Sequence, residues 1–261
     1  MTTTFEDDPE FGAYVANFPA NRSRLLLTAG VILAAVWFVL TVVLWQVEAG
    51  LASIITVGVI SVATLAVGWY VAHFWNREVV LYKRGFSYRE GSAIAFIRYA
   101  DVVALRQKAE RVSYFGGLVR RTIYRTTMKT VNDETIVLGS VYRRVDDLSL
   151  KLEQEVTRLL KPIIEVRLRK GEMVAFGERL TLNDSGISLP TPTDSQNPYA
   201  IPTNSSPDKH LPWSEFAGCT VEGGRLVLAS SSEPAWGVLP LEEIDNVRLL
   251  LDVLKSRAQQ P

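Results

Sequence analysis

The sequence is poor in the residues from which metal and redox sites are usually built. Cys219 is the only cysteine in 261 residues, so an intrachain disulfide and a site of several cysteines are both excluded. His73 and His210 are the only histidines, and with one cysteine they do not supply the usual four nitrogen or sulfur ligands of a zinc site. We therefore expect no metal and no cofactor, in a protein that resides in a reducing compartment.

Sequence motifs of common enzymes are also missing. The chain has no Gly-x-Ser-x-Gly turn, no Gly-x-x-x-x-Gly-Lys phosphate loop and no His-Glu-x-x-His zinc motif. A histidine base would have to come from His73 or from His210, which lies in a segment rich in proline and serine. We expect a protein that is not an enzyme, and an enzyme of unknown type is the least favoured alternative.

Charge is absent from two long stretches, although 28 Lys and Arg balance 28 Asp and Glu over the whole chain. Residues 25–47 and 51–72 form runs of 23 and 22 residues without Asp, Glu, Lys or Arg. At about 1.5 Å rise per residue, either helix can cross a hydrocarbon core of about 30 Å. Both runs are longer than the apolar part of a signal peptide, and neither has the polar stripe of a soluble helix. We predict a two-helix transmembrane hairpin over residues 24–75.

Basic residues indicate which way this hairpin faces. Arg22 and Arg24 precede the first run and Arg77 follows the second, whereas residues 48–50 between the runs carry no positive charge. Because Lys and Arg are enriched on the cytoplasmic side of membrane proteins, we expect both termini in the cytoplasm. The N-terminal tail, residues 1–23, contains an acidic segment at 6–10 that either folds back onto a basic surface or, as polar termini usually do, remains disordered.

The hydrophobic pattern changes to that of short strands after the second run. Strands are expected at 79–82, 86–88 and 93–97, followed by hairpins through 112–119 and 122–138. Apolar residues three and four apart then predict an amphipathic helix over 145–159, which Pro162 stops or kinks.

The next hundred residues repeat this order. Residues 78–88 align with 178–189 when Gly85 is matched to Gly186, and residues 97–102 align with 211–216. A hairpin over 225–239 and a helix with one apolar face close the second copy; that face carries Ile244, Val247, Leu250, Leu251 and Leu254. We therefore expect one domain over 76–161 and another over 162–261, the second with a flexible insertion at 190–210 that is rich in Pro, Ser and Thr.

Small barrels or sandwiches that end in one capping helix describe the pleckstrin-homology (PH)-like architecture, and here the residues resemble a known group. The resemblance covers residues 76–257 and is carried by glycines and aromatics: Tyr82, Gly85, Phe86, Tyr99, Gly171, Phe176, Gly177, Gly186, Trp213, Asp245 and Asn246. They look like an uncharacterised family of bacterial membrane proteins with tandem PH-like domains. The resemblance implies an α-hairpin plus α+β fold at the bacterial plasma membrane, and it implies no biochemical activity.

Each residue in these motifs also has a structural interpretation. Gly85 and Gly186 are expected in turns with positive φ, which glycine adopts without steric cost. Tyr99 and Trp213 occupy equivalent places and are expected in the cores. Asp101 and Glu215 belong to different copies, so we interpret them as caps or strand-end charges and not as a catalytic pair.

Basic residues in the first copy provide the main indication of function. Anionic lipids attract such a surface by about 1 kcal/mol per nearby Lys or Arg. A hairpin tip that combines aromatic and basic side chains is the sharpest candidate for contact with lipid or a partner. The candidate contact residues are Lys83, Arg84, Tyr114, Phe115, Arg120, Arg121 and Arg125.

Two hypotheses of different class follow. In the first, the tandem domains are a membrane-anchored, non-enzymatic interaction or scaffolding module that binds a protein partner at a sheet edge or beside a terminal helix. In the second, the first domain recognises anionic lipid headgroups or senses the membrane. A nucleic-acid partner is not expected, because the basic excess is small and the domain already lies at a bilayer.

Overall fold

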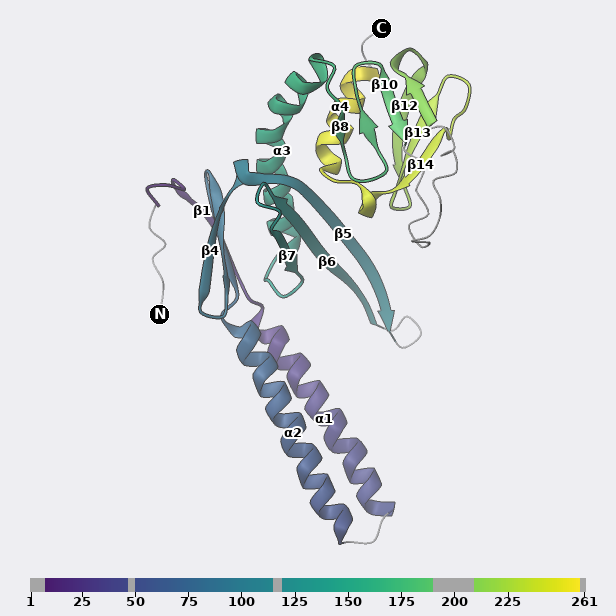
Figure 1. The fold of residues 1–261 in the computed structure, drawn as a ribbon. Helices are drawn as coiled ribbons and strands as arrows, with labels where there is room; N and C mark the ends of the chain where they lie inside the picture. Colours follow the sequence, from purple (N-terminus) through teal and green to yellow (C-terminus); the bar gives the residue numbers. More distant parts are fainter. Residues whose placement is uncertain (1–7, 47–49, 115–118, 190–208, 259–261) are drawn as a thin grey trace, which may run out of the picture. The chain divides into compact units, whose positions relative to one another are not determined.

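A computed structural model describes residues 8–46, 50–114, 119–189 and 209–258. Its contacts divide the chain into two compact units (Figure 1). Unit 1 comprises residues 1–98 and 140–145, and unit 2 comprises residues 99–139 and 146–261. The expected insertion at 190–210 lies almost wholly outside the described residues.

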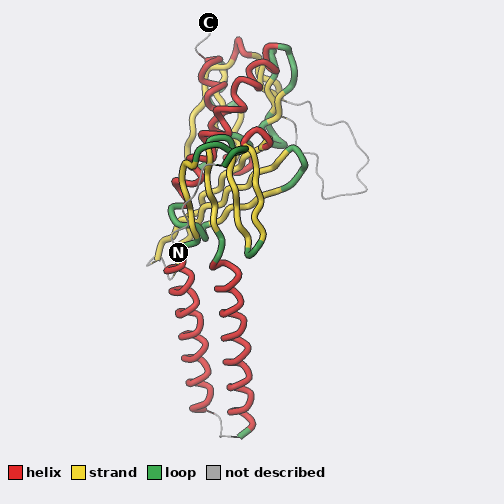
Figure 2. Tube along the Cα trace, turned by 90° about the vertical axis from the view of Figure 1, so that its left-hand side faces the viewer, coloured by secondary structure: helices red, strands yellow, loops and turns green. Residues whose placement is uncertain are grey.

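Two long helices, α1 (Arg22–Gln46) and α2 (Leu51–Trp75), run side by side in unit 1 (Figures 1 and 2). Both are long and apolar enough to cross a membrane, and only 6% of the residues in each apolar window are buried. Side chains as large as Phe38 and Leu65 are more than 70% exposed. The hydroxyls of Thr41 and Ser61 donate to carbonyls one turn earlier in their own helices, so these polar groups are satisfied without water.

The other part of unit 1 is a four-stranded antiparallel sheet in the order β1-β2-β3-β4. Its strands are β1 (Tyr14–Pro19), β2 (Glu78–Tyr82), β3 (Gly85–Glu90) and β4 (Ala93–Arg98). The last three were expected from the sequence.

Strand β1 was not predicted from the sequence; it pairs with β2 from Pro19↔Glu78 to Tyr14↔Tyr82. Phe18 on this strand is fully buried. Upstream, the Asp8 carboxylate accepts hydrogen bonds from two following backbone N–H groups, and Glu10 forms an ion pair with Arg98. The buried rings of Phe11 and Phe18 help to order the segment that follows the acidic positions.

Unit 2 begins with a short 3₁₀ turn, η1 (Tyr99–Asp101), and a three-stranded sheet in the order β5-β6-β7. Strands β5 (Val102–Tyr114) and β6 (Val119–Thr130) form one long hairpin, and β7 (Thr135–Gly139) pairs with β6 over Arg125–Lys129 only. Both expected hairpins are present and share β6. Tyr99 is 1% exposed, as expected for a core aromatic.

Helix α3 (Val145–Arg169) is longer than the sequence suggested, because it continues through Pro162. The sequence predicted that Pro162 stops or kinks the helix, and the helix does not stop there. The missing proline N–H costs one intrahelical hydrogen bond. Ile164 and Leu168 beyond it are buried in the hydrophobic core of unit 2, and this burial offsets the loss.

The second half of unit 2 contains two antiparallel sheets and a closing helix around that core. One sheet has β8 (Val174–Ala175), β9 (Thr181–Leu182), β10 (Gly186–Leu189) and β11 (Lys209–Pro212). After the 3₁₀ turn η3 (Trp213–Glu215), the other sheet has β12 (Phe216–Glu222), β13 (Arg225–Ser230) and β14 (Gly237–Pro240). A further 3₁₀ turn, η4 (Leu241–Glu243), leads to helix α4 (Val247–Ala258).

Gly85 and Gly186 have a different role from the one expected. Each is the first residue of a strand, β3 or β10, and neither has a positive φ. A Cβ at Gly85 would lie 2.3 Å from the carbonyl oxygen of Ile97, and one at Gly186 would lie 2.1 Å from that of Leu211. Glycine is therefore required by the close approach of a neighbouring backbone and not by a turn conformation.

Candidate functional site

A groove with a volume of about 800 Å³ lies within unit 2. One wall is the β5–β6 hairpin and another is the first turns of α3. The β12–β13 turn, the β14–η4 connection and the start of α4 complete the lining. At the β12–β13 turn, Gly223 and Gly224 both have positive φ, as two-residue hairpin turns that match strand twist require.

Asn246 holds the start of α4 against β5 at one end of this groove. Its side-chain oxygen accepts from the N–H of Leu105 at 3.0 Å, and its own backbone N–H donates to the Leu105 carbonyl at 2.7 Å. Its side-chain nitrogen donates to the carbonyl of Val103 at 3.1 Å. Asn246 is buried and has φ 52°, a conformation that Asn tolerates better than most residues. This one residue therefore takes the place of a neighbouring strand for the first part of β5.

Ion pairs reinforce the same contact. The guanidinium of Arg106 on β5 donates to the Asp245 carboxylate at 3.0 Å, and the Lys108 ammonium lies 2.9 Å from the Glu242 carboxylate. The first pair is partly buried and the second is half exposed, so the first contributes more. Two basic residues of the first sequence copy are thus neutralised within unit 2.

Glu153 on α3 joins α3 to the N-terminus of α4. Its carboxylate accepts a hydrogen bond from the backbone N–H of Arg248, one of the N–H groups that a helix leaves unpaired in its first turn. Burial raises the pKa of Glu153 above its usual value of 4.5, and the nearby Arg248 opposes that rise. The wall of the groove therefore contains a carboxylate that is already committed to the fold.

Arg125 and Arg225 are the basic groups of the groove that remain uncommitted. Both are exposed, and neither has an acidic group within 4.0 Å among the described side chains. Arg125 lies on β6 and Arg225 follows the glycine turn at the start of β13. An anionic group entering the groove would find these two charges available.

The predicted contact residues fall into two groups. Lys83 and Arg84 are exposed at the β2–β3 turn of unit 1, where their backbone N–H groups bond to the carbonyls of Ala13 and Phe11. Tyr114, Arg120, Arg121 and Arg125 belong to the β5–β6 hairpin of unit 2, and Phe115 lies outside the described residues. Register pairs Ser113 with Arg120 and Val112 with Arg121. Among Lys83, Arg84 and Arg125, whose side chains the structure describes, only Arg125 lines the groove.

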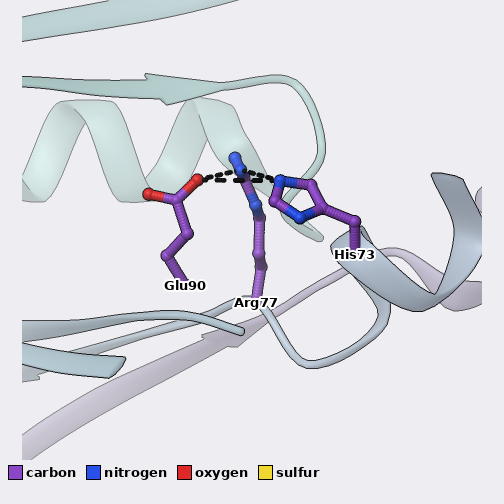
Figure 3. A network of polar contacts seen from close by, with 3 residues as sticks. All are labelled: His73, Arg77 and Glu90. Atoms are coloured by element: carbon purple, nitrogen blue, oxygen red, sulfur yellow. Dashed lines mark hydrogen bonds and ion pairs between the residues drawn. The ribbon is translucent and has the colours of Figure 1, made fainter. Parts of the chain in front are cut away.

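A second polar cluster lies in unit 1, where α2 ends (Figure 3). Arg77 donates to the Nε2 atom of His73 at 3.0 Å and forms an ion pair with Glu90 on β3. The Arg77 guanidinium also lies 4.3 Å from the centre of the Phe74 ring. Since arginine has no acceptor, His73 must be unprotonated at Nε2 for this hydrogen bond to form. The cluster fixes the direction in which the chain leaves α2.

Sequence reasoning missed the residues that build the groove. Asp245 and Asn246 were noted only as motif positions, and Glu153 and Glu242 were not noted. The signal for Asn246 was its position directly before an apolar helix, which is typical of a helix cap. Nothing in the sequence indicates that its side chain pairs with Leu105. No group of three or more His, Cys, Asp or Glu that could hold a metal occurs in the described parts of the chain.

Comparison with known proteins places the chain without assigning it an activity. A family of unknown function (DUF6585) matches residues 1–193, which is most of the chain. The match therefore covers both long helices, the sheet of unit 1 and the β5–β6–β7 sheet. No curated protein matches the sequence.

Proposed function

The chain belongs to the DUF6585 family of unknown function, and on that premise we propose that it is a membrane-anchored, non-enzymatic interaction module. In this proposal α1 and α2 span the bacterial plasma membrane, and the remaining residues bind a partner protein in the cytoplasm. The anchor, the orientation, the domain type and the binding surface are supported by separate observations.

The exposure of the apolar helices carries the proposal. Burying apolar surface contributes about 25 cal/mol per Å², so a soluble protein gains by covering such helices. In unit 1 only 6% of the residues in each apolar window are buried, and large side chains such as Phe38 and Leu65 stay exposed. A bilayer is the environment that covers a two-helix hairpin of this length on all sides.

Charges at the helix ends support a cytoplasmic location for both termini. Arg22 and Arg24 begin α1, and Arg77 follows α2. The guanidinium of Arg22 lies 5.1 Å from the ring centre of Trp75, which places a basic and an aromatic side chain together at the same end of the hairpin. This pairing is typical of the cytoplasmic interface of membrane proteins.

Two matching series of elements support tandem PH-like domains. Gly85 and Gly186 make equivalent close approaches to the carbonyls of Ile97 and Leu211. The 3₁₀ turns η1 and η3 begin two residues after Ile97 and Leu211, respectively. Each turn leads to a strand whose pairing register shifts after its first residue. A three-stranded antiparallel sheet and a long helix then close each series. We assign the series to residues 76–161 and 162–261.

The groove in unit 2 favours binding over catalysis. Of its three acidic groups, Glu153 and Glu242 already pair with Arg248 and Lys108, and Asp146 is an exposed carboxylate in the first turn of α3. Its remaining arginines carry charge that attracts an anionic partner but cannot act as a general base near neutral pH. The groove also borders the edge strand β5, and edge strands are a common docking surface for extended peptides.

Lipid recognition by the basic residues is the second candidate, and the geometry of unit 1 disfavours it for Lys83 and Arg84. These residues lie at the end of β2 opposite α2, because β2 begins at Glu78 next to the helix. Five strand residues span roughly 16 Å at about 3.3 Å each. This length exceeds the Debye length of about 8 Å at physiological ionic strength, over which a charged surface acts.

Membrane extraction tests the anchor. Val62 and Leu65 lie near the middle of α2 with exposed side chains. An arginine at the centre of a spanning helix costs about 2.5–3.5 kcal/mol on insertion scales. We expect the wild-type chain to stay in the membrane pellet at alkaline pH, and the Val62→Arg/Leu65→Arg variant to appear in the supernatant or to be degraded. Val221→Arg, on the exposed face of β12, is the matched control. Extraction of the wild-type chain would refute the proposal.

A further inference from the structure

Strand β5 has one edge that is only partly covered. The sheet order β5-β6-β7 makes β5 an edge strand. Asn246 occupies that edge at Leu105, whose N–H and C=O both point toward it. Because the backbone direction alternates along a strand, every second residue after Leu105 points the same way. The residues that present N–H and C=O groups to this edge are therefore Gln107, Ala109, Arg111 and Ser113.

This edge is long and regular. Pairing of β5 with β6 shows no register shift between Ala104↔Lys129 and Tyr114↔Val119. The edge from residue 107 to residue 113 extends over roughly 20 Å at about 3.3 Å per residue. Unpaired edges of this kind are templates for another strand, and proteins usually shorten, bend or cover them. Among the residues that the structure describes, the hydrogen bonds to the backbone of this edge come from Asn246, at its beginning.

The sequence of the β5–β6 hairpin is strongly basic. Between residues 106 and 125, Glu110 is the only acidic residue. The basic residues are Arg106, Lys108, Arg111, Arg120, Arg121 and Arg125. Arg106 and Lys108 pair with acidic groups of unit 2, whereas exposed Arg125 and Arg225 face the groove without such a partner among the described side chains. The hairpin therefore attracts an acidic ligand.

From this combination we propose that the free edge of β5 binds an extended acidic segment of a partner protein as an added strand. The main chain of that segment pairs with residues 107–113, and its carboxylates at alternate positions meet Arg125 and Arg225. The inference deepens the proposed interaction function, on which it rests, by assigning the chemistry of the partner.

Two other occupants fit the observations less well. A lipid surface satisfies the arginines but offers no backbone to the N–H and C=O groups of the edge. A second copy of this chain, paired edge to edge, would bring Lys108 and Arg111 of one copy beside the same basic residues of the other. Like charges opposite each other destabilise a sheet.

The first test uses the full chain in a neutral detergent. The probes are a fluorescent peptide of eleven alternating Glu and Val residues and its counterpart with Lys in place of Glu. We expect the Glu peptide to bind, with an affinity that falls as salt is raised, and the Lys peptide to bind at least tenfold more weakly. Equal binding of the two peptides, or no binding of the Glu peptide, overturns the inference.

Matched proline variants test whether the backbone edge is used. Ala109→Pro removes an N–H that points to the open edge and leaves the β5–β6 pairing intact. Val137→Pro makes the same change on the outer edge of β7. The backbone groups of Ile136 and Leu138 point toward their partners Met128 and Thr126 on β6, so the N–H of residue 137 between them points outward. We expect Ala109→Pro to weaken Glu-peptide binding about tenfold and Val137→Pro to change it less than twofold. Equal binding by both variants overturns strand addition.

A second measurement keeps the test independent of variant folding. In the unmodified chain, the Glu peptide should slow amide hydrogen exchange at residues 107–113 and leave residues 135–139 unchanged. The same exchange measurement with anionic phosphatidylglycerol vesicles tests whether a lipid surface occupies this edge instead. If the vesicles protect residues 107–113 and the Glu peptide does not, the inference is overturned. Because membrane extraction does not depend on β5, a failed peptide test with an intact anchor is distinguishable from failure of the proposed anchor.

Discussion

The side-chain amide of Asn246 pairs with the backbone N–H of Leu105 at 3.0 Å, so a residue directly before the last helix completes the edge of a strand that lies 141 positions earlier. Its own backbone N–H returns a bond to the Leu105 carbonyl at 2.7 Å. The β5–β6–β7 sheet and α4 are therefore joined by main-chain pairing and not only by apolar contact. This junction makes the groove beside it a fixed feature of unit 2.

Replacing Asn246 should destabilise unit 2. Asn246→Gly keeps the positive φ at no steric cost but removes both side-chain hydrogen bonds, so we expect a loss of about 2 kcal/mol. Asn246→Ala adds the strain of a left-handed conformation, and the loss should rise to about 3 kcal/mol. Urea unfolding of the detergent-solubilised chain measures both. Asn132→Ala, in an exposed turn, is the control and should change the stability by less than about 0.5 kcal/mol. Losses equal to the control would show that the junction carries little energy.

Adding a methyl group at Gly186 tests the close backbone approach. Its Cβ would meet the carbonyl oxygen of Leu211 at 2.1 Å, so β10 or β11 must shift. We expect Gly186→Ala to cost about 2–3 kcal/mol, as overpacking of a rigid neighbour does. Gly139→Ala, whose Cβ would meet nothing within 4 Å, provides the comparison. If the two variants melt at the same temperature, the strand approach is not as tight as described.

The half-buried carboxylate of Glu153 makes stability depend on pH. Burial raises its pKa above 4.5 in the folded chain, so the folded state holds this proton more tightly than the unfolded state. The contribution of the protonated Glu153 carboxyl to the free energy of unfolding is therefore fully present below about pH 4.5 and is lost as the pH rises through the raised pKa. Glu153→Gln stays neutral at every pH. We therefore expect the free energy of unfolding of Glu153→Gln, relative to that of the wild-type chain, to increase from pH 4 to pH 7.

Urea midpoints of both chains at pH 4, 5, 6 and 7 measure this trend. Glu165→Gln, an exposed position on the same helix, is the matched control for general charge effects. If the difference in urea midpoint between Glu153→Gln and the wild-type chain does not change from pH 4 to pH 7, the pKa of the half-buried Glu153 is not raised.

The sequence predicted those elements whose signal is local. The uncharged runs marked α1 and α2, and alternating apolar residues marked β2, β3 and β4. Strand β1 was missed because its order comes from burial of Phe18 and pairing with a strand about sixty residues later. Helix α3 was cut short because the cost of Pro162 is local, whereas the burial of Ile164 and Leu168 that offsets it is tertiary.

The candidate site was less accessible for the same reason. Arg125 was recognised from its charge and does line the groove. Glu153, Glu242 and Asn246 acquire their roles only from partners more than ninety positions away, and a single sequence does not indicate such pairs. The membership in an uncharacterised family was confirmed, whereas the PH-like assignment and the bacterial origin stay predictions.

The most direct test of a membrane-anchored protein with a cytoplasmic binding region is the accessibility of single cysteines. The natural chain offers a simple background, because Cys219→Ser removes the only cysteine. New cysteines at Gly50, between the helices, and at Ser231, in an exposed turn of unit 2, report on the two sides. In intact bacterial spheroplasts, a membrane-impermeant maleimide should label position 50 at once and position 231 only after the membrane is opened. Labelling of position 231 in intact spheroplasts, or equal labelling of both positions, would contradict the account.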